Sequence, residues 1–161
     1  MNPITIHVDG GMAGTKHAGA AAIARTQEGY FLGWLSCQLP AMTNNEAEYH
    51  AAQLGLKLAQ TLGAKYVVIA SDSEVIVRQM RGQSRVLSQK LKRLHQQTCT
   101  QTAVFQQVTF HHIPREENHL ADALATEAMS GRIVQMPTLA TSPRPHNNTQ
   151  SWLTRLMRST P

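Results

Sequence analysis

The stretch KYVVIASD, residues 65–72, constrains the fold more than any other part of this 161-residue chain. Its apolar run is continuous and rich in β-branched residues, which indicates a strand that is buried on both faces. Strands of this kind are typical of parallel sheets that helices cover on both sides. The stretch therefore predicts an α/β domain, with this strand ending at Asp72.

The segments before and after this strand supply the rest of a layered domain. ITIHVDGG alternates apolar residues on one face and predicts a first strand that ends at Asp9. AGAAAIART and YFLGWLSCQL predict two more strands, whose short connection favours an antiparallel meander, and VTFHHI predicts a last strand. Helices are expected from Thr43 to about Leu62, from about Glu74, from about Leu87 to Thr98, and over NHLADALATEAMS, which Gly131 closes.

The expected order is β-β-β-α-β-α-α-β-α, an α/β domain with a mixed sheet over residues 1–133. Residues 134–149 contain prolines and almost no core-forming residues, so we expect a flexible linker there. Residues 150–161 repeat apolar residues at helical spacing beside arginines. This last segment is either a frayed amphipathic tail or a docking segment for a protein partner.

Charge and composition indicate the cellular compartment of the protein and the kind of partner that it binds. The chain has 15 Lys and Arg against 10 Asp and Glu, a formal charge of +5, which is compatible with a polyanionic partner. Its two cysteines lack metal-type spacing and fit a reducing cytosol better than a disulfide framework. With neither a secretory signal nor a membrane span evident, we expect a soluble, cytoplasmic monomer.

Basic residues are concentrated in one stretch without any acid. This stretch is either a solvated helix face or a surface that contacts the phosphates of a nucleic acid. Its members are Arg78, Arg81, Arg85, Lys90, Lys92 and Arg93.

Two glutamates in TNNEAEY, residues 43–49, have different expected surroundings although they belong to one helix. At about 100° per residue, Glu48 lies in the centre of the apolar stripe that should pack on the sheet, whereas Glu46 lies on the solvent face. Thr43 at the N-cap, with Glu46 following at the third helical position, also forms a capping box. Glu46 therefore has a structural role that Glu48 lacks.

Glu48 would place an ionised carboxylate on a buried face, which is costly unless the charge is paired or binds a metal. A buried ion pair and a functional site are both open. Asp9 and Asp72 follow strands, where open α/β sheets place their sites, and Asp122 lies in the first turns of the last helix. If the four carboxylates converge, Mg²⁺ would relieve their repulsion. Two such ions about 4 Å apart can activate a water for phosphodiester hydrolysis.

The motifs VDGG, TNNEAEY, SDSE and HIPREENHLADALA, spread over about residues 3–132, resemble those of ribonuclease H, type 1. The stretch between Asp72 and Asp122 is short for members with an extended basic protrusion. Arg115 resembles the basic residue of the archaeal-type and plant-type relatives. The resemblance implies a mixed five-stranded sheet flanked by helices, with three antiparallel strands and two parallel strands.

The resemblance also implies an activity. The family hydrolyses the RNA strand of RNA–DNA hybrids with two Mg²⁺ ions, for which Mn²⁺ can substitute, and leaves 5′-phosphate and 3′-hydroxyl ends. Two alternatives are a non-catalytic hybrid-binding module and a structure-specific DNA nuclease of the same superfamily. Intact acids at the matched positions speak against the first alternative, and the pair Asn44 and Asn45 argues against the second.

Carried over residue by residue, the resemblance assigns metal binding and catalysis to Asp9, Glu48, Asp72 and Asp122. The remaining matched positions are expected to contact the hybrid, in its minor groove, where ribose 2′-hydroxyls distinguish RNA from DNA, or along its backbone. They are Gly10, Gly11, Asn44 and Asn45 for the minor groove, Thr43 for a phosphate of the DNA strand, and Asn118 in the loop before the last acid.

Two residues compete for one catalytic position ahead of the last acid. Many bacterial members have a mobile histidine there, in a glycine-containing loop, that is thought to help product release. Here the loop HHIPREEN is short and lacks glycine, and His112 falls within the expected last strand. We therefore assign the position to Arg115. Glu74, in the motif SDSE, is expected to occupy the first turn of a helix, where the helix dipole favours an acid.

Overall fold

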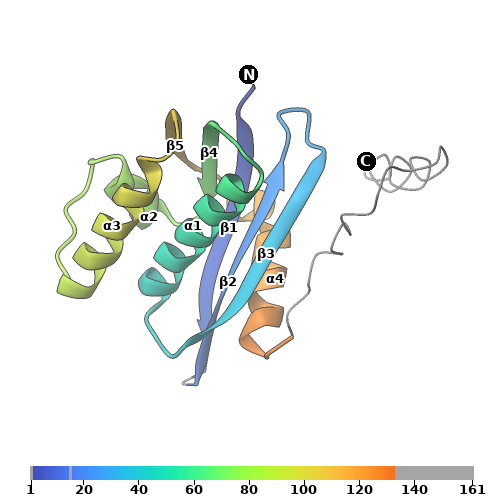
Figure 1. The fold of residues 1–161 in the computed structure, drawn as a ribbon. Helices are drawn as coiled ribbons and strands as arrows, with labels where there is room; N and C mark the ends of the chain where they lie inside the picture. The colour runs from blue at the N-terminus through green and yellow to red at the C-terminus, as the bar shows by residue number, and fades with distance from the viewer. Residues whose placement is uncertain (1, 15, 133–161) are drawn as a thin grey trace.

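A computed structural model describes residues 2–14 and 16–132 of the chain (Figure 1). The predicted linker at 134–149 and the predicted tail at 150–161 lie outside the described residues. The order of elements within the described part is the expected one, with a short 3₁₀ turn at Arg115–Glu117 before the last helix. The elements are β1 (Ile4–Ala13), β2 (His17–Arg25), β3 (Phe31–Pro40), α1 (Asn44–Thr61), β4 (Tyr66–Ser71), α2 (Glu74–Met80), α3 (Gln89–Thr102), β5 (Gln107–His112) and α4 (His119–Met129).

The strands form one mixed sheet in the order β3-β2-β1-β4-β5. Strand β2 pairs antiparallel with both β1 and β3, whereas β4 pairs parallel with both β1 and β5. The sheet therefore confirms the prediction of three antiparallel strands joined to two parallel ones. It also explains the apolar run of residues 65–72, because β4 has a neighbouring strand on each edge and is mostly buried.

Strand β1 is longer than the sequence predicts. It does not end at Asp9 but continues to Ala13, because its antiparallel pairing with β2 extends as far as the pair Ala13–His17. The parallel pairing with β4, in contrast, ends at the pair His7–Ala70. Asp9 therefore lies within a strand, at the point where β4 no longer accompanies it.

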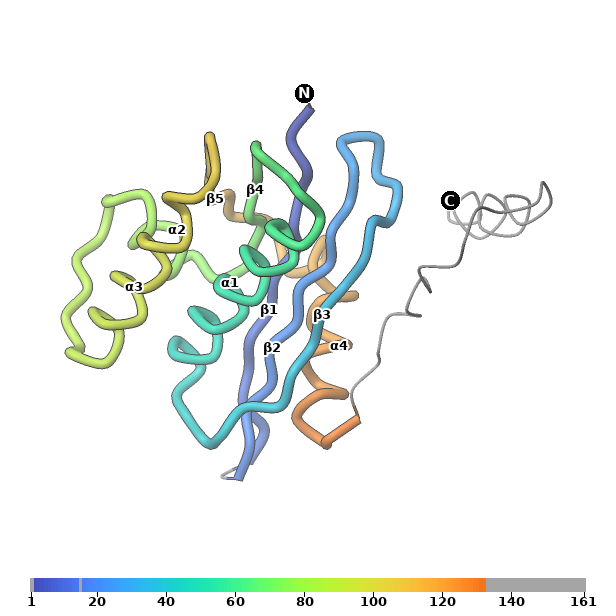
Figure 2. Tube along the Cα trace, in the orientation of Figure 1, coloured from blue at the N-terminus to red at the C-terminus, as the bar shows by residue number. Residues whose placement is uncertain are grey.

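Helix α1 covers one face of the sheet and α4 covers the opposite face, as Figures 1 and 2 show. Two successive residues of β1 demonstrate this arrangement: a Cβ added at Gly10 would meet Ala47 of α1, and one added at Gly11 would meet Met129 of α4. Helices α2 and α3 pack beside α1. The core lies mainly between α1 and strands β1, β2 and β4, whose inward side chains are almost fully buried.

The helix boundaries agree with the sequence patterns except in α3, which ends later than expected, at Thr102 instead of Thr98. Helix α1 begins directly after the N-cap Thr43, and α2 begins at Glu74, both as expected. Helix α3 begins later than expected, because Ser88 is its N-cap and Leu87 precedes the helix with 82% of its surface exposed. Within residues 2–14 and 16–132, no helix combines the length and the apolar character that crossing a membrane requires.

Candidate active site

Three of the four predicted acids converge at one point of the sheet. Asp9 comes from β1, Asp72 follows β4 directly, and Glu48 comes from the second turn of α1. Each offers a carboxylate oxygen, and these three oxygens lie within 4.8 Å of one another. The site forms because β4 ends beside the middle of β1, so that both aspartates emerge at the same edge.

Gly10 allows Glu48 to reach this cluster. A Cβ at Gly10 would clash with the backbone of α1 at Ala47 and Glu48, so only a glycine permits α1 to approach β1 this closely. The Gly10 amide also donates a hydrogen bond to the Glu48 carboxylate, although the buried Oε2 of Glu48 has no partner among the described residues. The glycine after Asp9 thus positions the acid that comes from the helix.

Burial and the crowding of carboxylates raise the pKa values of Glu48 and Asp9. Burial is the largest cause for Glu48, followed by the charges of Asp9 and Asp72, and together they raise its pKa to about 9. Burial, the charges of Asp72 and Asp122, and a hydrogen bond with Asp72 raise the pKa of Asp9 to about 7. Three oxygen donors whose ionised forms are this costly are suited to hold a metal cation.

The fourth acid, Asp122, lies at the edge of the cluster. It comes from the first turn of α4 and lines the same groove, of about 340 Å³, as the other three acids. Its side chain is 43% exposed, and its Oδ1 lies 3.8 Å from a guanidinium nitrogen of Arg115. We call this space the acidic groove; of the predicted residues, those that line it are Asp9, Gly10, Gly11, Asn44, Glu48, Asp72, Arg115 and Asp122.

The structure separates the two residues that compete for the catalytic basic position. Arg115 belongs to the 3₁₀ turn before α4 and lines the acidic groove. His112 is the last residue of β5, is exposed, and does not line the groove. This placement favours Arg115, whose role in catalysis stays a prediction.

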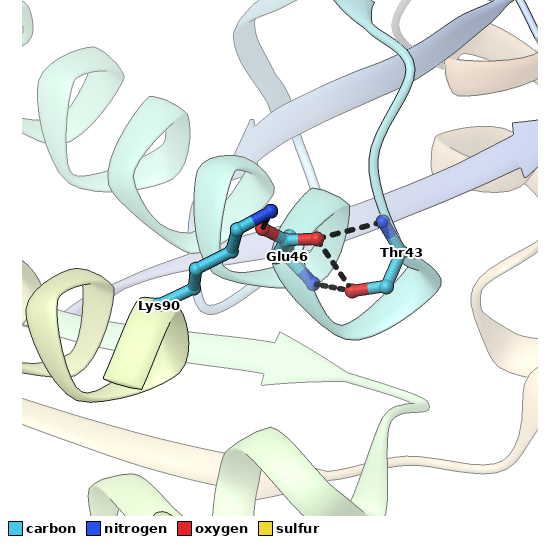
Figure 3. A network of polar contacts seen from close by, with 3 residues as sticks. All are labelled: Thr43, Glu46 and Lys90. Atoms are coloured by element: carbon cyan, nitrogen blue, oxygen red, sulfur yellow. Dashed lines mark hydrogen bonds and ion pairs between the residues drawn. The ribbon is translucent and has the colours of Figure 1, made fainter. Parts of the chain in front are cut away.

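At the start of α1, Thr43, Glu46 and Lys90 form a polar network that does not include Glu48 (Figure 3). The Thr43 amide donates to Glu46 Oε2 over 2.8 Å, and the Glu46 amide donates to Thr43 Oγ1 over 3.3 Å. This confirms the predicted capping box. Lys90 of α3 adds an ion pair to Glu46 at 3.8 Å.

The asparagines predicted to contact substrate occupy different environments. Asn44 is exposed, and its Oδ1 accepts a hydrogen bond from the Met12 amide of β1 over 3.1 Å. Asn45 is half-buried and, like Thr43, does not line the acidic groove. Asn118 is only 1% exposed, so its side chain lies beneath the surface of the site. Their contacts with a substrate stay predictions.

Four groove residues were absent from the sequence interpretation: Met12 and Ala13 of β1, and Thr126 and Met129 of α4. Thr126 and Met129 of α4 line the acidic groove together with Asp122. They follow Asp122 by four and seven positions, a spacing that places side chains on one face of a helix. Helical periodicity counted from Asp122 could therefore have found both.

Known proteins share the sequence pattern and the fold of this chain. The reverse transcriptase-like family matches residues 7–128 of the chain. The solved N-terminal RNase H domain of Rv2228c from Mycobacterium tuberculosis is 31% identical, with a TM-score of 0.77, over 82% of this chain and 96% of that domain. The chain belongs to the ribonuclease H family.

Other members of the ribonuclease H family extend the comparison. RNase H1 of Halobacterium salinarum is 25% identical, with a TM-score of 0.77, over 80% of this chain and 98% of that one. LC11-RNase H1, solved in complex with an RNA/DNA hybrid, is 34% identical, with a TM-score of 0.75, over 80% of this chain and 97% of that one. The bifunctional protein Rv2228c of Mycobacterium tuberculosis is 33% identical over 128 residues, 78% of this chain but only 35% of its own length. The ribonuclease H-like chain thus spans about a third of the length of that curated relative.

Proposed function

We propose that the chain is an endoribonuclease that hydrolyses the RNA strand of RNA–DNA hybrids and leaves 5′-phosphate and 3′-hydroxyl ends. The observation that carries this proposal is the convergence of Asp9, Glu48 and Asp72 to within 4.8 Å in a groove that also receives Asp122. Membership of the ribonuclease H family and the likeness to LC11-RNase H1, solved with a hybrid, support the choice of substrate.

The donor set fits Mg²⁺, with Mn²⁺ as a substitute. All donors are carboxylate oxygens, the hard ligands that these ions prefer, and the buried Oε2 of Glu48 lacks any other partner in the described structure. Two bound ions would lower the pKa of an attacking water and stabilise the leaving oxygen. Asp9, Glu48 and Asp72 would hold these ions at a fixed place, and Asp122 would contribute a ligand from the edge of the groove.

The remaining groove residues are proposed to orient the hybrid. The half-buried backbone at Gly11 and the exposed side chain of Asn44 border the acids, where donors and acceptors can read a ribose 2′-hydroxyl. Asn45 in the first turn of α1 and its N-cap Thr43 are proposed to add contacts with the hybrid beyond the groove. Arg115, 3.8 Å from Asp122, carries a positive charge toward the scissile phosphate and supports turnover.

A cleavage assay with defined duplexes tests the proposal. We expect a hybrid with an end-labelled RNA strand to be nicked internally in the presence of Mg²⁺ and left intact in EDTA. The Asp72→Asn variant is the matched control, since it keeps the shape of the side chain and removes its charge. Double-stranded DNA and double-stranded RNA of the same sequence are run beside it.

The result distinguishes the alternatives. Equal cutting of duplex DNA would indicate a DNA nuclease of the same superfamily. Hybrid binding that survives without any cleavage by wild-type protein, in either Mg²⁺ or Mn²⁺, would indicate a binding module and refute the enzymatic proposal.

A further inference from the structure

Asn118 is buried at the base of the site, between the strands that carry the two aspartates. Its side-chain amide donates two hydrogen bonds, to the Val8 carbonyl over 2.9 Å and to Asp72 Oδ1 over 3.0 Å. The parallel pairing of β1 with β4 ends at His7 and Ala70, one residue before Val8 and two before Asp72. Asn118 therefore continues the connection between the two segments beyond the point where backbone pairing stops.

The position of Asn118 in its own helix shows that these bonds replace a local one. Asn118 is the N-cap residue of α4, where an asparagine side chain ordinarily accepts a hydrogen bond from the first turn. Here the side chain makes no such cap bond, and its buried Oδ1 has no partner among the described residues. A residue that gives up its local preference in favour of distant partners is characteristic of functional sites.

Asn118 also lies behind the acidic groove instead of lining it. It lines a second cavity, of about 410 Å³, together with His7 and Arg25 on the other side of the loop. With 1% of its surface exposed, the side chain of Asn118 offers little surface to the groove, and its contacts in the structure are with Val8 and Asp72. Its partner Asp72, however, lies directly in the acid cluster.

We propose that Asn118 is a positioning residue, which fixes the Asp72 carboxylate relative to β1 so that Asp72 and Asp9 present their oxygens to the same cation. This inference rests on the proposed function, for which the acids hold the metal. The neutral amide occupies one lone pair of Asp72 Oδ1 and leaves the other carboxylate oxygen available. Because it carries no charge, it orients the acid without competing with the cation for that charge.

Calorimetric titration of the full chain with MnCl₂, without nucleic acid, tests this proposal. We expect Asn118→Ala to weaken Mn²⁺ binding by about tenfold or more, the usual effect of removing a partner that orients a metal ligand. Asp72→Asn provides the reference for loss of a ligand. Thr98→Val is the control for loss of a buried hydrogen bond, because Thr98 is fully buried between α1 and α3, away from the groove. Its Mn²⁺ affinity should equal that of wild type.

Hybrid cleavage supplies a second readout. The Mg²⁺ concentration for half-maximal cleavage should rise about tenfold in Asn118→Ala, while KM for the hybrid stays near that of wild type. If Asn118→Ala does not fold, Asn118→Ser, which retains one donor, should show the same direction of change. Unchanged Mn²⁺ affinity, or an increased KM for the hybrid at unchanged metal affinity, would overturn the inference. If wild-type protein binds Mn²⁺ and Asn118→Ala binds it weakly, but neither cleaves a hybrid, the proposed function fails while Asn118 keeps its positioning role.

Discussion

Two faces of α1 place chemically identical side chains in opposite environments. Glu46 does not lie on a solvent face, as the sequence predicted it would, because α3 packs beside α1 and leaves the Glu46 side chain only 13% exposed. Hydrogen bonds from the Thr43 backbone and side chain, and the nearby Lys90, lower its pKa. Glu48, on the sheet face, has its pKa raised to about 9 by burial and by two neighbouring aspartates. The first glutamate is ionised with its charge satisfied, and the second is held where its charge needs a cation. The comparison teaches that one acid stabilises the helix while the other costs stability in return for a binding site.

The largest expected effect separates the two glutamates by activity. Glu48→Gln should lower hybrid cleavage by about 10³-fold or more, since losing a metal ligand removes several kcal/mol of transition-state stabilisation. Glu46→Gln, its matched control, should keep most of the activity, because glutamine can also complete a capping box. The measurement is the rate of hybrid cleavage at saturating Mg²⁺. Comparable losses in both variants would remove the functional distinction between the two faces.

The same comparison predicts an unusual dependence of stability on pH in metal-free protein. Folding raises the pKa of Glu48 to about 9 and that of Asp9 to about 7, so the folded state binds more protons than the unfolded state above about pH 4. The free energy of unfolding should therefore fall as the pH rises from about 4 to 9. Denaturant unfolding in EDTA at several pH values measures this change.

Glu48→Gln should remove the contribution of this residue to the pH dependence of stability. At pH 8 in EDTA the variant should be more stable than wild type, by on the order of 2 kcal/mol, because its folding no longer requires a carboxylate that is ionised in the unfolded state to take up a proton. Adding Mg²⁺ should stabilise wild type and leave the variant nearly unchanged. A variant less stable than wild type at pH 8 would show that Glu48 does not carry the burial cost argued for it.

Removing the capping interaction should change the free energy of unfolding less, and should lower it instead of raising it. Glu46→Ala should lower the free energy of unfolding by about 1 kcal/mol at pH 7, since the Thr43 amide loses its acceptor. Because folding lowers the pKa of Glu46, this contribution is present above the pKa of the unfolded state and is lost as the pH falls through the folded pKa. Thermal unfolding of wild type and Glu46→Ala at pH 7 and pH 3 should therefore show a smaller difference between the two proteins at pH 3 than at pH 7.

Contacts between residues close in sequence could be predicted, whereas contacts between residues far apart in sequence could not. The capping box joins residues three apart, and helical phase is equally local, so the cap role of Glu46 and the position of Glu48 beside the sheet could be predicted. The packing of α3 beside Glu46 could not. The bonds of Asn118 join it to Asp72 and Val8 over 46 and 110 residues. No local pattern encodes such a contact, so the sequence interpretation made Asn118 a substrate contact and gave no hint of its bond to Asp72.

Strand β1 shows the same limit within the fold. The glycines after Asp9 were interpreted as the end of the strand, which is the usual local meaning of glycine. Pairing with β2 extends the strand to Ala13, and the lack of a side chain at Gly10 instead admits α1. The mixed sheet could nevertheless be predicted, because the continuous, β-branched apolar run of β4 indicates burial on both faces.

The smallest expected effect concerns the ion pair between Lys90 and Glu46. Lys90 is 80% exposed and lies 3.8 Å from Glu46, so Lys90→Gln should change the free energy of unfolding by less than about 0.5 kcal/mol. If the basic stretch of residues 78–93 contacts phosphates, the same variant should raise KM for the hybrid. It should also reduce, by about one, the slope of the logarithm of the hybrid-binding constant against the logarithm of the salt concentration. Lys65→Gln, at the opposite end of β4 from Asp72, is the charge-matched control. Equal effects of the two variants on KM and on its salt dependence would mean that only net charge matters, and that this face of α3 is a solvated surface.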